Sequence, residues 1–235
     1  MRKKRILLKL TGTILGSNTF ESRHLVSLAQ QIKRLEKQHV QFGIVIGGGN
    51  IFRGNQHGTS LNITPSIGHQ VGMFATVMNG LLIHDLFSQY DVQNSLLCAL
   101  DCPEIGPVIS SITIENALRN QNVIIFTGGT GNPFFSTDTN AILRALQMEA
   151  AQIWKGTDVD GIYTKDPDIY PDAKLLHKLT YRHALDQNLH VMDATAFALA
   201  REYHQTVRVF NIFEEDSLIK AYENEEFGSL VYTQD

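Results

Sequence analysis

Short apolar runs alternate with stretches of helical periodicity along the whole chain. Residues 5–10 and 40–46 are largely apolar, as is typical of strands that are buried in a parallel sheet. Between these two runs, apolar side chains recur at helical spacing at Leu25, Leu28, Ile32 and Leu35. The first unit of the chain is therefore predicted to be strand, helix, strand.

The same alternation continues to the C-terminal end. Further strands are predicted at 92–97, 123–127, 152–155 and 207–211, with strands and loops in the Gly- and Asp-rich stretch around 161–163. Helices are predicted at 68–88, 115–119, 138–146, 181–186, 193–203 and 216–222. This order predicts a three-layer α/β/α sandwich with a mostly parallel sheet of about eight strands.

Two helical details can be specified further. Thr137 or Asp138 is the expected N-cap of the helix 138–146. In the helix 68–88, one stripe is apolar, and we expect it to pack into the core. This stripe consists of Val71, Ala75, Met78, Leu82 and Leu86.

Length and composition favour one domain. The chain has 235 residues, of which 43% are hydrophobic, so it can bury one sizeable core, and we expect a single domain over residues 1–235. Its formal net charge is -4, and the short basic start at residues 2–5 gives no field that would hold a nucleic-acid backbone. Nucleic acid is therefore not an expected partner.

Neither a membrane segment nor a metal site is expected from the sequence. Lys9 interrupts the apolar run 6–10 well before the length of a signal peptide core or a bilayer span, so a cytoplasmic protein is expected. Cys98 and Cys102 have no His or Cys neighbours that would complete a zinc pattern. We interpret both as reduced packing residues, with a redox or metal role as the alternative.

Three glycine-rich loops follow predicted strands, at residues 9–12, 47–54 and 128–138. In open α/β sheets, ligands bind beyond the carboxyl ends of the strands, where helix N-termini also point. The three successive glycines from Gly47 to Gly49 cost backbone entropy. A close approach of backbone amides to a phosphate explains them better than a plain tight turn.

These loops do not match the common nucleotide fingerprints. Gly49 and Gly54 have the glycine spacing of a P-loop, but Asn55 stands where that motif requires lysine, and no G-x-G-x-x-G follows the first strand. A P-loop kinase and a Rossmann dehydrogenase are therefore disfavoured. The sequence also lacks a G-x-S-x-G elbow and an H-E-x-x-H pair, so acyl transfer and zinc hydrolysis have no support.

Several motifs together resemble bacterial UMP kinase of the amino-acid kinase superfamily. They are Lys9-Leu10-Thr11-Gly12, Gly47 to Gly54, Val77-Met78-Asn79-Gly80, Thr130-Gly131-Asn132-Pro133-Phe134-Phe135, Lys155-Gly156-Thr157-Asp158-Val159-Asp160-Gly161, Val191-Met192-Asp193 and Arg208-Val209-Phe210-Asn211. Their order and spacing match along nearly the whole chain. The T-G-N-P-F-F run is the most specific, because related acetylglutamate, glutamate and aspartate kinases share the glycine-rich loop but use other acceptor loops.

The resemblance implies transfer of the γ-phosphate of ATP to UMP, giving UDP and ADP in pyrimidine nucleotide biosynthesis. It also implies the amino-acid kinase fold, a homohexamer, and Mg2+ that is carried by ATP and not bound directly by the protein. The ATP site that it implies is lined by Lys9, Leu10, Thr11, Gly12, Gly49, Arg53, Thr157, Tyr163 and Asp166. The UMP site that it implies is formed by Gly48, His69, Thr130, Gly131, Asn132, Pro133, Phe134, Phe135, Ser136 and Thr137.

Phosphoryl transfer to UMP needs charge compensation more than a catalytic base, because the acceptor phosphate is already ionised and two anions must be brought together. Lys9 and Lys155 end predicted strands and are placed to stabilise charge on the transferring group, with solvated lysines as the alternative. Asp138 can orient either lysine or a magnesium-bound water, with a helix cap as its alternative.

The sequence departs from the family at three places. Where the family has an aspartate for the UMP ribose, this chain has His69, which can accept one hydrogen bond but lacks the charge of a carboxylate. We therefore expect weaker or altered ribose recognition. Thr13 replaces a glutamate, the following turn is shortened to about Gly16 through Glu21, and His84 replaces an arginine near a GTP effector site. The catalytic positions are kept, whereas the regulatory ones are not.

Two other functions remain as alternatives. One is another kinase of the superfamily with a carboxylate or a small phosphate as acceptor, against which the T-G-N-P-F-F run argues. The other is a nucleotide-binding regulator or storage protein that has lost turnover, as His69 and Thr13 could suggest. Both Lys9 and Lys155 are retained, and a pure binder has less need of charge at the transfer point.

Overall fold

The computed structural model describes residues 4–16, 20–53, 61–167, 169–189 and 191–234. Within them, eight strands form one sheet in the order β3-β4-β2-β1-β5-β7-β8-β6. The strands are β1 (Lys4–Leu10), β2 (Val40–Ile46), β3 (Asn94–Cys98), β4 (Val123–Thr127), β5 (Gln152–Thr157), β6 (Lys178–Thr180), β7 (Val207–Asn211) and β8 (Ser229–Tyr232). Neighbouring strands are parallel except for β7 and β8, so the predicted, mostly parallel sheet is confirmed.

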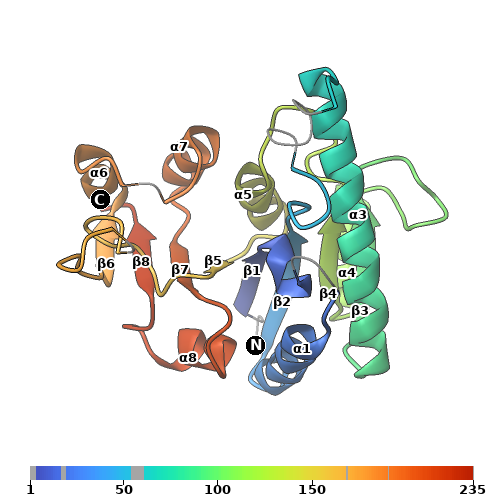
Figure 1. Ribbon diagram of the computed structural model, residues 1–235. Coiled ribbons are helices and arrows are strands. Elements are labelled where there is room, and N and C mark those ends of the chain that lie inside the picture. The colour runs from blue at the N-terminus through green and yellow to red at the C-terminus, as the bar shows by residue number, and fades with distance from the viewer. Residues whose placement is uncertain (1–3, 17–19, 54–60, 168, 190, 235) are drawn as a thin grey trace.

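Helices cover both faces of this sheet. They are the 3-10 helix η1 (Gly12–Leu15) and the α-helices α1 (Arg23–Glu36), α3 (Pro65–Gln89), α4 (Ser111–Arg119), α5 (Thr137–Gln147), α6 (Tyr181–Asp186), α7 (Ala194–Glu202) and α8 (Ser217–Glu223). Figure 1 shows α5, α6 and α7 above the sheet and α1 and α8 below it, with α3 along the right-hand side.

Two hydrophobic cores lie between the helices and the sheet. In β1, Ile6 and Leu8 pack into the core shared with α1, α3 and α8, while Leu7 packs into the core shared with α4, α5, α6 and α7. This division follows from the strand period of two, which sends successive side chains to opposite faces. The three-layer α/β/α arrangement predicted from the sequence is confirmed.

The predicted elements are present, with ends that differ by a few residues. The strands β6 and β8 had no predicted bounds, and both are short. The N-cap of α5 was predicted wrongly, because Ser136 caps this helix by accepting the Thr139 N–H at 3.0 Å. Asp138 is therefore in the first turn, and its carboxylate is available to other partners. The predictions that involve residues 2 and 3, the turn at 17–19, and Gly54 and Asn55 lie outside the described residues.

The prediction for the apolar stripe of α3 was wrong for three of its five residues, whereas Leu86 packs against the core as predicted. Ala75 is buried, but Val71, Met78 and Leu82 are 37%, 51% and 42% exposed. Apolar residues lie on most sides of this helix, so its period did not show which side faces the core. By length and composition alone α3 could also cross a membrane, a test that the core helix of a soluble protein passes as well.

The connections of β1 place a ligand site at the middle of the sheet. Its neighbours are β2 on one side and β5 on the other, so the chain winds in opposite directions from β1. At such a switch point, the loops after the two adjacent strands separate and leave a crevice at the carboxyl ends. The glycine-rich loops after β1 and β2, and the start of α5, lie at this edge.

Candidate active site

Two lysines and one aspartate meet at the switch point. The register of β1 and β5 sets Lys9 opposite Lys155. The Nζ atom of Lys9 lies 2.9 Å from Oδ1 of Asp138, and the Nζ atom of Lys155 lies 2.7 Å from Oδ2. Lys155 also donates a hydrogen bond of 2.7 Å to the carbonyl oxygen of Val191. The structure thus brings together the three predicted catalytic residues, which we call the lysine–aspartate cluster (Lys9, Lys155 and Asp138).

Burial and charge act on this cluster in opposite directions. Burial raises the pKa of the Asp138 carboxyl, but the charges and hydrogen bonds of Lys9 and Lys155 outweigh it and hold that pKa below 3.8. Burial lowers the pKa of Lys155 below 10.5, opposed by Asp138 and assisted by the like charge of Lys9. At neutral pH one carboxylate faces two ammonium groups, so the cluster carries a net positive charge that favours anions.

Asp193 connects the start of α5 to the start of α7. As the N-cap of α7, its Oδ1 accepts the N–H groups of Thr195 at 3.0 Å and Ala196 at 3.1 Å. Its Oδ2 accepts a hydrogen bond from the hydroxyl of Ser136, and the hydroxyl of Thr139 donates to Oδ1 at 3.3 Å. One carboxylate therefore fixes both helix N-termini beside the lysine–aspartate cluster.

The loop after β2 packs closely against α3. A Cβ atom at Gly48 would lie 2.7 Å from the Cβ of Ala75 and 2.9 Å from the carbonyl oxygen of Gly72, so only glycine fits there. The fully buried Asn79 of α3 holds the same loop, since its Nδ2 donates to the carbonyl oxygen of Gly47 at 2.7 Å and to Oδ1 of Asn50 at 2.7 Å. This packing fixes the backbone amides of the loop, as a phosphate-binding loop requires.

A cavity of about 440 Å³ opens between this loop, the N-terminal half of α3 and the loop that precedes α5. Its lining includes five of the predicted UMP-site residues, Gly48, His69, Phe135, Ser136 and Thr137. Gly49 and Arg53, which were predicted to contact ATP, line the same cavity, and Nε of Arg53 donates to the carbonyl oxygen of Gly49 at 2.9 Å. We call this space the first cavity.

The loop before α5 owes its shape to residues in the left-handed region. Gly129 and Gly131 have φ values of 60° and 82°, and Phe134 has a φ of 70°. A positive φ is unusual for a bulky residue, and such backbone strain is often found at functional sites. The ring of Phe134 lies against the ring of His69 with 4.9 Å between centroids. These two rings connect the loop to α3 beside the first cavity, which His69 lines.

A second cavity of about 420 Å³ lies beyond the carboxyl end of β5. It is lined by Lys155 together with Thr157, Tyr163 and Asp166, which were predicted to contact ATP. Burial and the neighbouring carboxylate of Asp160 raise the pKa of Tyr163, whose hydroxyl donates to Asp160 at 3.3 Å. Because Lys155 lines the second cavity and Thr137 lines the first, the lysine–aspartate cluster lies between the two.

The other predicted site residues have more varied surroundings. Leu10 is fully buried in β1, and the hydroxyl of Thr11 lies 3.1 Å from that of Thr13. Gly12 packs so closely on Asn50 that a Cβ atom would lie 2.2 Å from its Oδ1. Thr130 and Asn132 line, with Phe135, a third cavity of about 880 Å³ between α5 and α7. Gly131 and Pro133 belong to the same loop, and Phe135 of that loop lines both the first and the third cavity.

Asn79 and Asp193 were missed as site residues by the sequence analysis, although both belong to motifs that carry the resemblance. A fully buried amide in an apolar helix is the one signal that could have pointed to Asn79, because buried polar groups need hydrogen-bond partners.

A direct metal site was not predicted, and within the described ranges no group of three His, Cys, Asp or Glu side chains gathers as metal ligands do.

The sequence matches the model of the amino acid kinase family over residues 4–211. The uridylate kinase of Mycoplasma pneumoniae is 43% identical over 226 residues, which cover 94% of this chain and 95% of that protein. The uridylate kinase of Thermotoga petrophila is 40% identical over 231 residues, which cover 97% and 98% of the two chains.

Solved structures agree with these sequence relationships. The crystal structure of UMP kinase from Ureaplasma parvum superimposes with a TM-score of 0.93 at 35% identity and covers 100% of both chains. The UMP kinase from Bacillus anthracis also gives a TM-score of 0.93, at 30% identity, and covers 100% of this chain and 98% of that one. The chain belongs to the amino acid kinase family, within the branch of the uridylate kinases.

Proposed function

We propose that this protein is a UMP kinase, which transfers the γ-phosphate of ATP to UMP and releases UDP and ADP. The observation that carries the proposal is the position of the lysine–aspartate cluster between two separate cavities. Kinases of this kind must bring two anions together, and a buried positive charge at the meeting point meets that need. Similarity to uridylate kinases over nearly the whole chain supports UMP as the acceptor.

We assign the first cavity to UMP and the second to ATP. In the first, the amides of Gly48 and Gly49 and the guanidinium of Arg53 would bind phosphate oxygens, while the loop from Thr130 to Thr137 would hold the nucleoside. In the second, side chains beyond the end of β5 would surround the adenine nucleotide, so that its phosphates point towards the cluster. Arg53 and Gly49, which the resemblance assigns to ATP, line the first cavity, and in this proposal they would reach the γ-phosphate of ATP from the UMP side.

The transfer step would need no catalytic base. A phosphate oxygen of UMP attacks the γ-phosphorus atom of ATP, a new P–O bond forms, and the bond to the β-phosphate oxygen breaks. Lys9 and Lys155 would stabilise the charge on the equatorial oxygens, and Asp138 would hold both ammonium groups in place. Mg2+ bound to the phosphates of ATP would supply further charge neutralisation.

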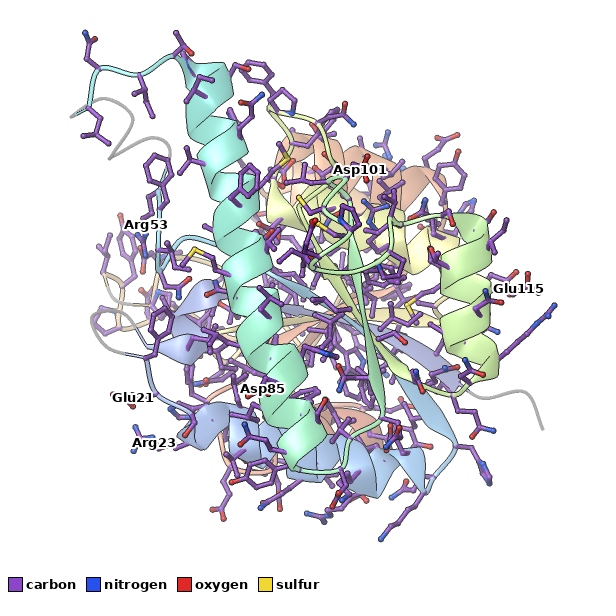
Figure 2. All side chains as sticks on the ribbon, turned by 90° about the vertical axis from the view of Figure 1, so that its right-hand side faces the viewer. Glu21, Arg23, Arg53, Asp85, Asp101 and Glu115 are labelled. Carbon is purple, nitrogen blue, oxygen red and sulfur yellow. The ribbon has the colours of Figure 1, made fainter. Side chains whose placement is uncertain are left out.

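We also propose that the protein assembles into a homohexamer through contacts that include α3. Ile67, Val71, Phe74, Met78 and Leu82 are 37% to 54% exposed and recur at helical spacing, and we call them the exposed α3 stripe. Figure 2 shows α3 on the surface of the molecule, with the labelled Asp85 near its C-terminal end and Arg53 beside its N-terminal half. An apolar stripe of this kind favours burial against a second copy.

The remaining parts of the proposal concern the setting of the enzyme. We place it in the cytoplasm, in pyrimidine nucleotide biosynthesis, where UDP formation follows UMP synthesis. We also infer that residues 1–235 make one kinase domain, because all the described strands join a single sheet.

Release of ADP tests this function directly. The protein is incubated with ATP, Mg2+ and UMP, dUMP, CMP or AMP in turn, with and without GTP, and ADP is measured by a coupled assay. Rapid turnover with UMP and slow turnover with CMP and AMP is expected. Binding of UMP and ATP without ADP release would contradict a kinase and favour a nucleotide-binding regulator.

A further inference from the structure

Arg144 is a buried cation without a carboxylate partner. It lies in the last turn of α5 and is 4% exposed. Its Nη1 donates to Oε1 of Gln147 at 2.7 Å, and its Nη2 donates to the carbonyl oxygen of Gly129 at 3.1 Å. Within the described part of the chain, no ion pair involves Arg144, and its buried Nε has no hydrogen-bond partner.

Such a cation is costly to bury, so packing alone does not explain it. An apolar side chain of similar size would fill the same space under α5 without the loss of hydration. Burial lowers the pKa of Arg144 to about 10, yet the guanidinium stays charged at neutral pH. The guanidinium lies over the ring of Phe126, 6.0 Å from its centroid, and bonds to Gln147 of its own helix. Its remaining hydrogen bond goes to the backbone of Gly129, which lines the first cavity.

The turn at Gly128 and Gly129 is held from two helices. From α3, the hydroxyl of Thr76 accepts the Gly128 N–H at 3.0 Å. From α5, Arg144 holds the Gly129 carbonyl oxygen. Both glycines have a positive φ, at 74° and 60°, so without these contacts the turn could adopt other conformations. The direction of the next peptide group therefore depends on Arg144.

That peptide group joins Gly129 to Thr130. In a planar trans peptide, the C=O and the N–H point in opposite directions. Because the C=O of Gly129 points at Arg144, the N–H of Thr130 points away from Arg144. Among the described residues, this N–H has no hydrogen-bond partner. The adjacent positive charge polarises the peptide and makes the N–H a stronger donor.

We propose that Arg144 is a positioning residue that determines base specificity, by presenting the Thr130 N–H to a carbonyl oxygen of the acceptor base. The inference rests on the proposed function, because it assumes a pyrimidine nucleotide that occupies the first cavity and extends its base to Thr130, which lines the third cavity. Phe135 lines both cavities, so the two adjoin. Uracil carries a carbonyl oxygen where cytosine carries an amino group. A fixed N–H donor would bind the carbonyl oxygen of uracil. With cytosine, the N–H and the amino group are both donors, so neither would have a hydrogen-bond acceptor.

Replacement of Arg144 by an apolar side chain tests the proposal. For Arg144→Met, the ratio of kcat/KM for UMP to that for CMP is expected to fall about tenfold, since the N–H is no longer held. The KM for UMP rises, whereas the KM for ATP stays the same because the second cavity is untouched. A purely structural role would change the two KM values together and leave the ratio alone.

Arg208 provides the matched control. It is also 4% exposed, and its Nη1 donates to the carbonyl oxygens of Asn224, Glu225 and Phe227, so it too holds a turn. Arg208→Met should lower thermal stability without changing the UMP to CMP ratio. Arg144→Lys keeps the charge but not the planar fork, and should give an intermediate ratio.

Two further variants keep the proposal testable if Arg144→Met fails to fold. Gln147→Leu removes the side chain that orients Nη1 and should lower the same ratio by a smaller factor. An unchanged ratio in Arg144→Met, or in both Arg144→Lys and Gln147→Leu, would overturn the inference. Turnover of UMP by the unaltered protein is measured first, so failure of the proposed function is recognised separately.

Discussion

At the scale of single residues, one carboxylate is shared by two lysines at the proposed transfer point. Lys9 and Lys155 are neighbours because β1 and β5 are parallel and in register, and like charges at that distance repel each other. Asp138 relieves this repulsion from the first turn of α5, where the helix dipole also favours a negative charge. The position of Asp138 in the first turn of α5 therefore lets two lysines lie side by side in a buried site.

The lowered pKa of Asp138 predicts how the cluster affects stability. A carboxyl with a depressed pKa in the folded state contributes stability above its unfolded pKa, which is lost as the pH falls through the folded value. At pH 7, the free energy of unfolding of the unaltered protein should therefore be higher than that of Asp138→Asn. The difference between the two proteins should shrink below pH 3.8. Urea denaturation between pH 7 and pH 3 measures it, and a difference that grows towards low pH would contradict the prediction.

His69 is the residue at which we expect altered ribose recognition. It lines the first cavity and contacts Phe134, so it is positioned to reach a nucleoside. A His69→Asp variant should prefer UMP over dUMP by about two- to tenfold more than the unaltered protein, because a carboxylate is the better acceptor for ribose hydroxyls. The ratio of kcat/KM values measures this preference, with the KM for ATP as control. Equal discrimination by the two proteins would contradict it.

The sequence alone predicted the three cluster residues, because two lysines at strand ends and an aspartate at a helix start are visible in the pattern. Asn79 and Arg144 were not assigned a role. Each sits within a helix and acts on the backbone of a loop that is distant in sequence, so no local pattern records the contact. Their roles depend on how α3 and α5 pack against the loops.

At the scale of elements, two helix N-termini are linked by one side chain. Asp193 caps α7 and also accepts hydrogen bonds from Ser136, the cap of α5, and from Thr139. The helix α5 carries Asp138 into the cluster, while Val191, just before α7, accepts a hydrogen bond from Lys155. Asp193 thus links the elements that surround both cavities.

Loss of this link should weaken both helices. Asp193→Ala leaves the N–H groups at the start of α7 without a cap, which typically costs about 1 kcal/mol for one helix, and it also frees Ser136. We expect a lower free energy of unfolding in urea and a lower kcat. Asp186→Asn, an exposed carboxylate on α6, is the control and should change neither quantity. Unchanged kcat and stability in Asp193→Ala would contradict the linking role.

At the scale of the whole molecule, the order of the elements was predictable and the exposure of α3 was not. Alternating patterns fixed a layered sandwich, since strands of period two and helices of period 3.6 leave few other arrangements. Which side of α3 faces the sheet depends on packing, because apolar residues lie on most sides of this helix. The exposed α3 stripe could therefore be identified only from the packing of α3 against the sheet, not from its sequence.

The stripe predicts the state of association. Phe74 is 54% exposed at the middle of the stripe, and Phe74→Glu should lower the molecular mass measured by light scattering, because a charge opposes burial at an interface. Ile112 on α4 is 69% exposed and lies outside the stripe, so Ile112→Glu is the matched control. An unchanged mass for Phe74→Glu would show that α3 does not join subunits.

The most direct test of the account follows the phosphoryl group itself. ATP labelled in its γ-phosphate is mixed with UMP and excess enzyme, and labelled UDP is measured over a single turnover. At enzyme concentrations high enough to bind all of the labelled ATP, Lys155→Ala should form labelled UDP about a hundredfold to a thousandfold more slowly, while the exposed Lys178→Ala keeps the normal rate. Transfer to UMP at the same rate in Lys155→Ala would contradict the proposed site. No transfer by the unaltered protein would contradict the proposed reaction.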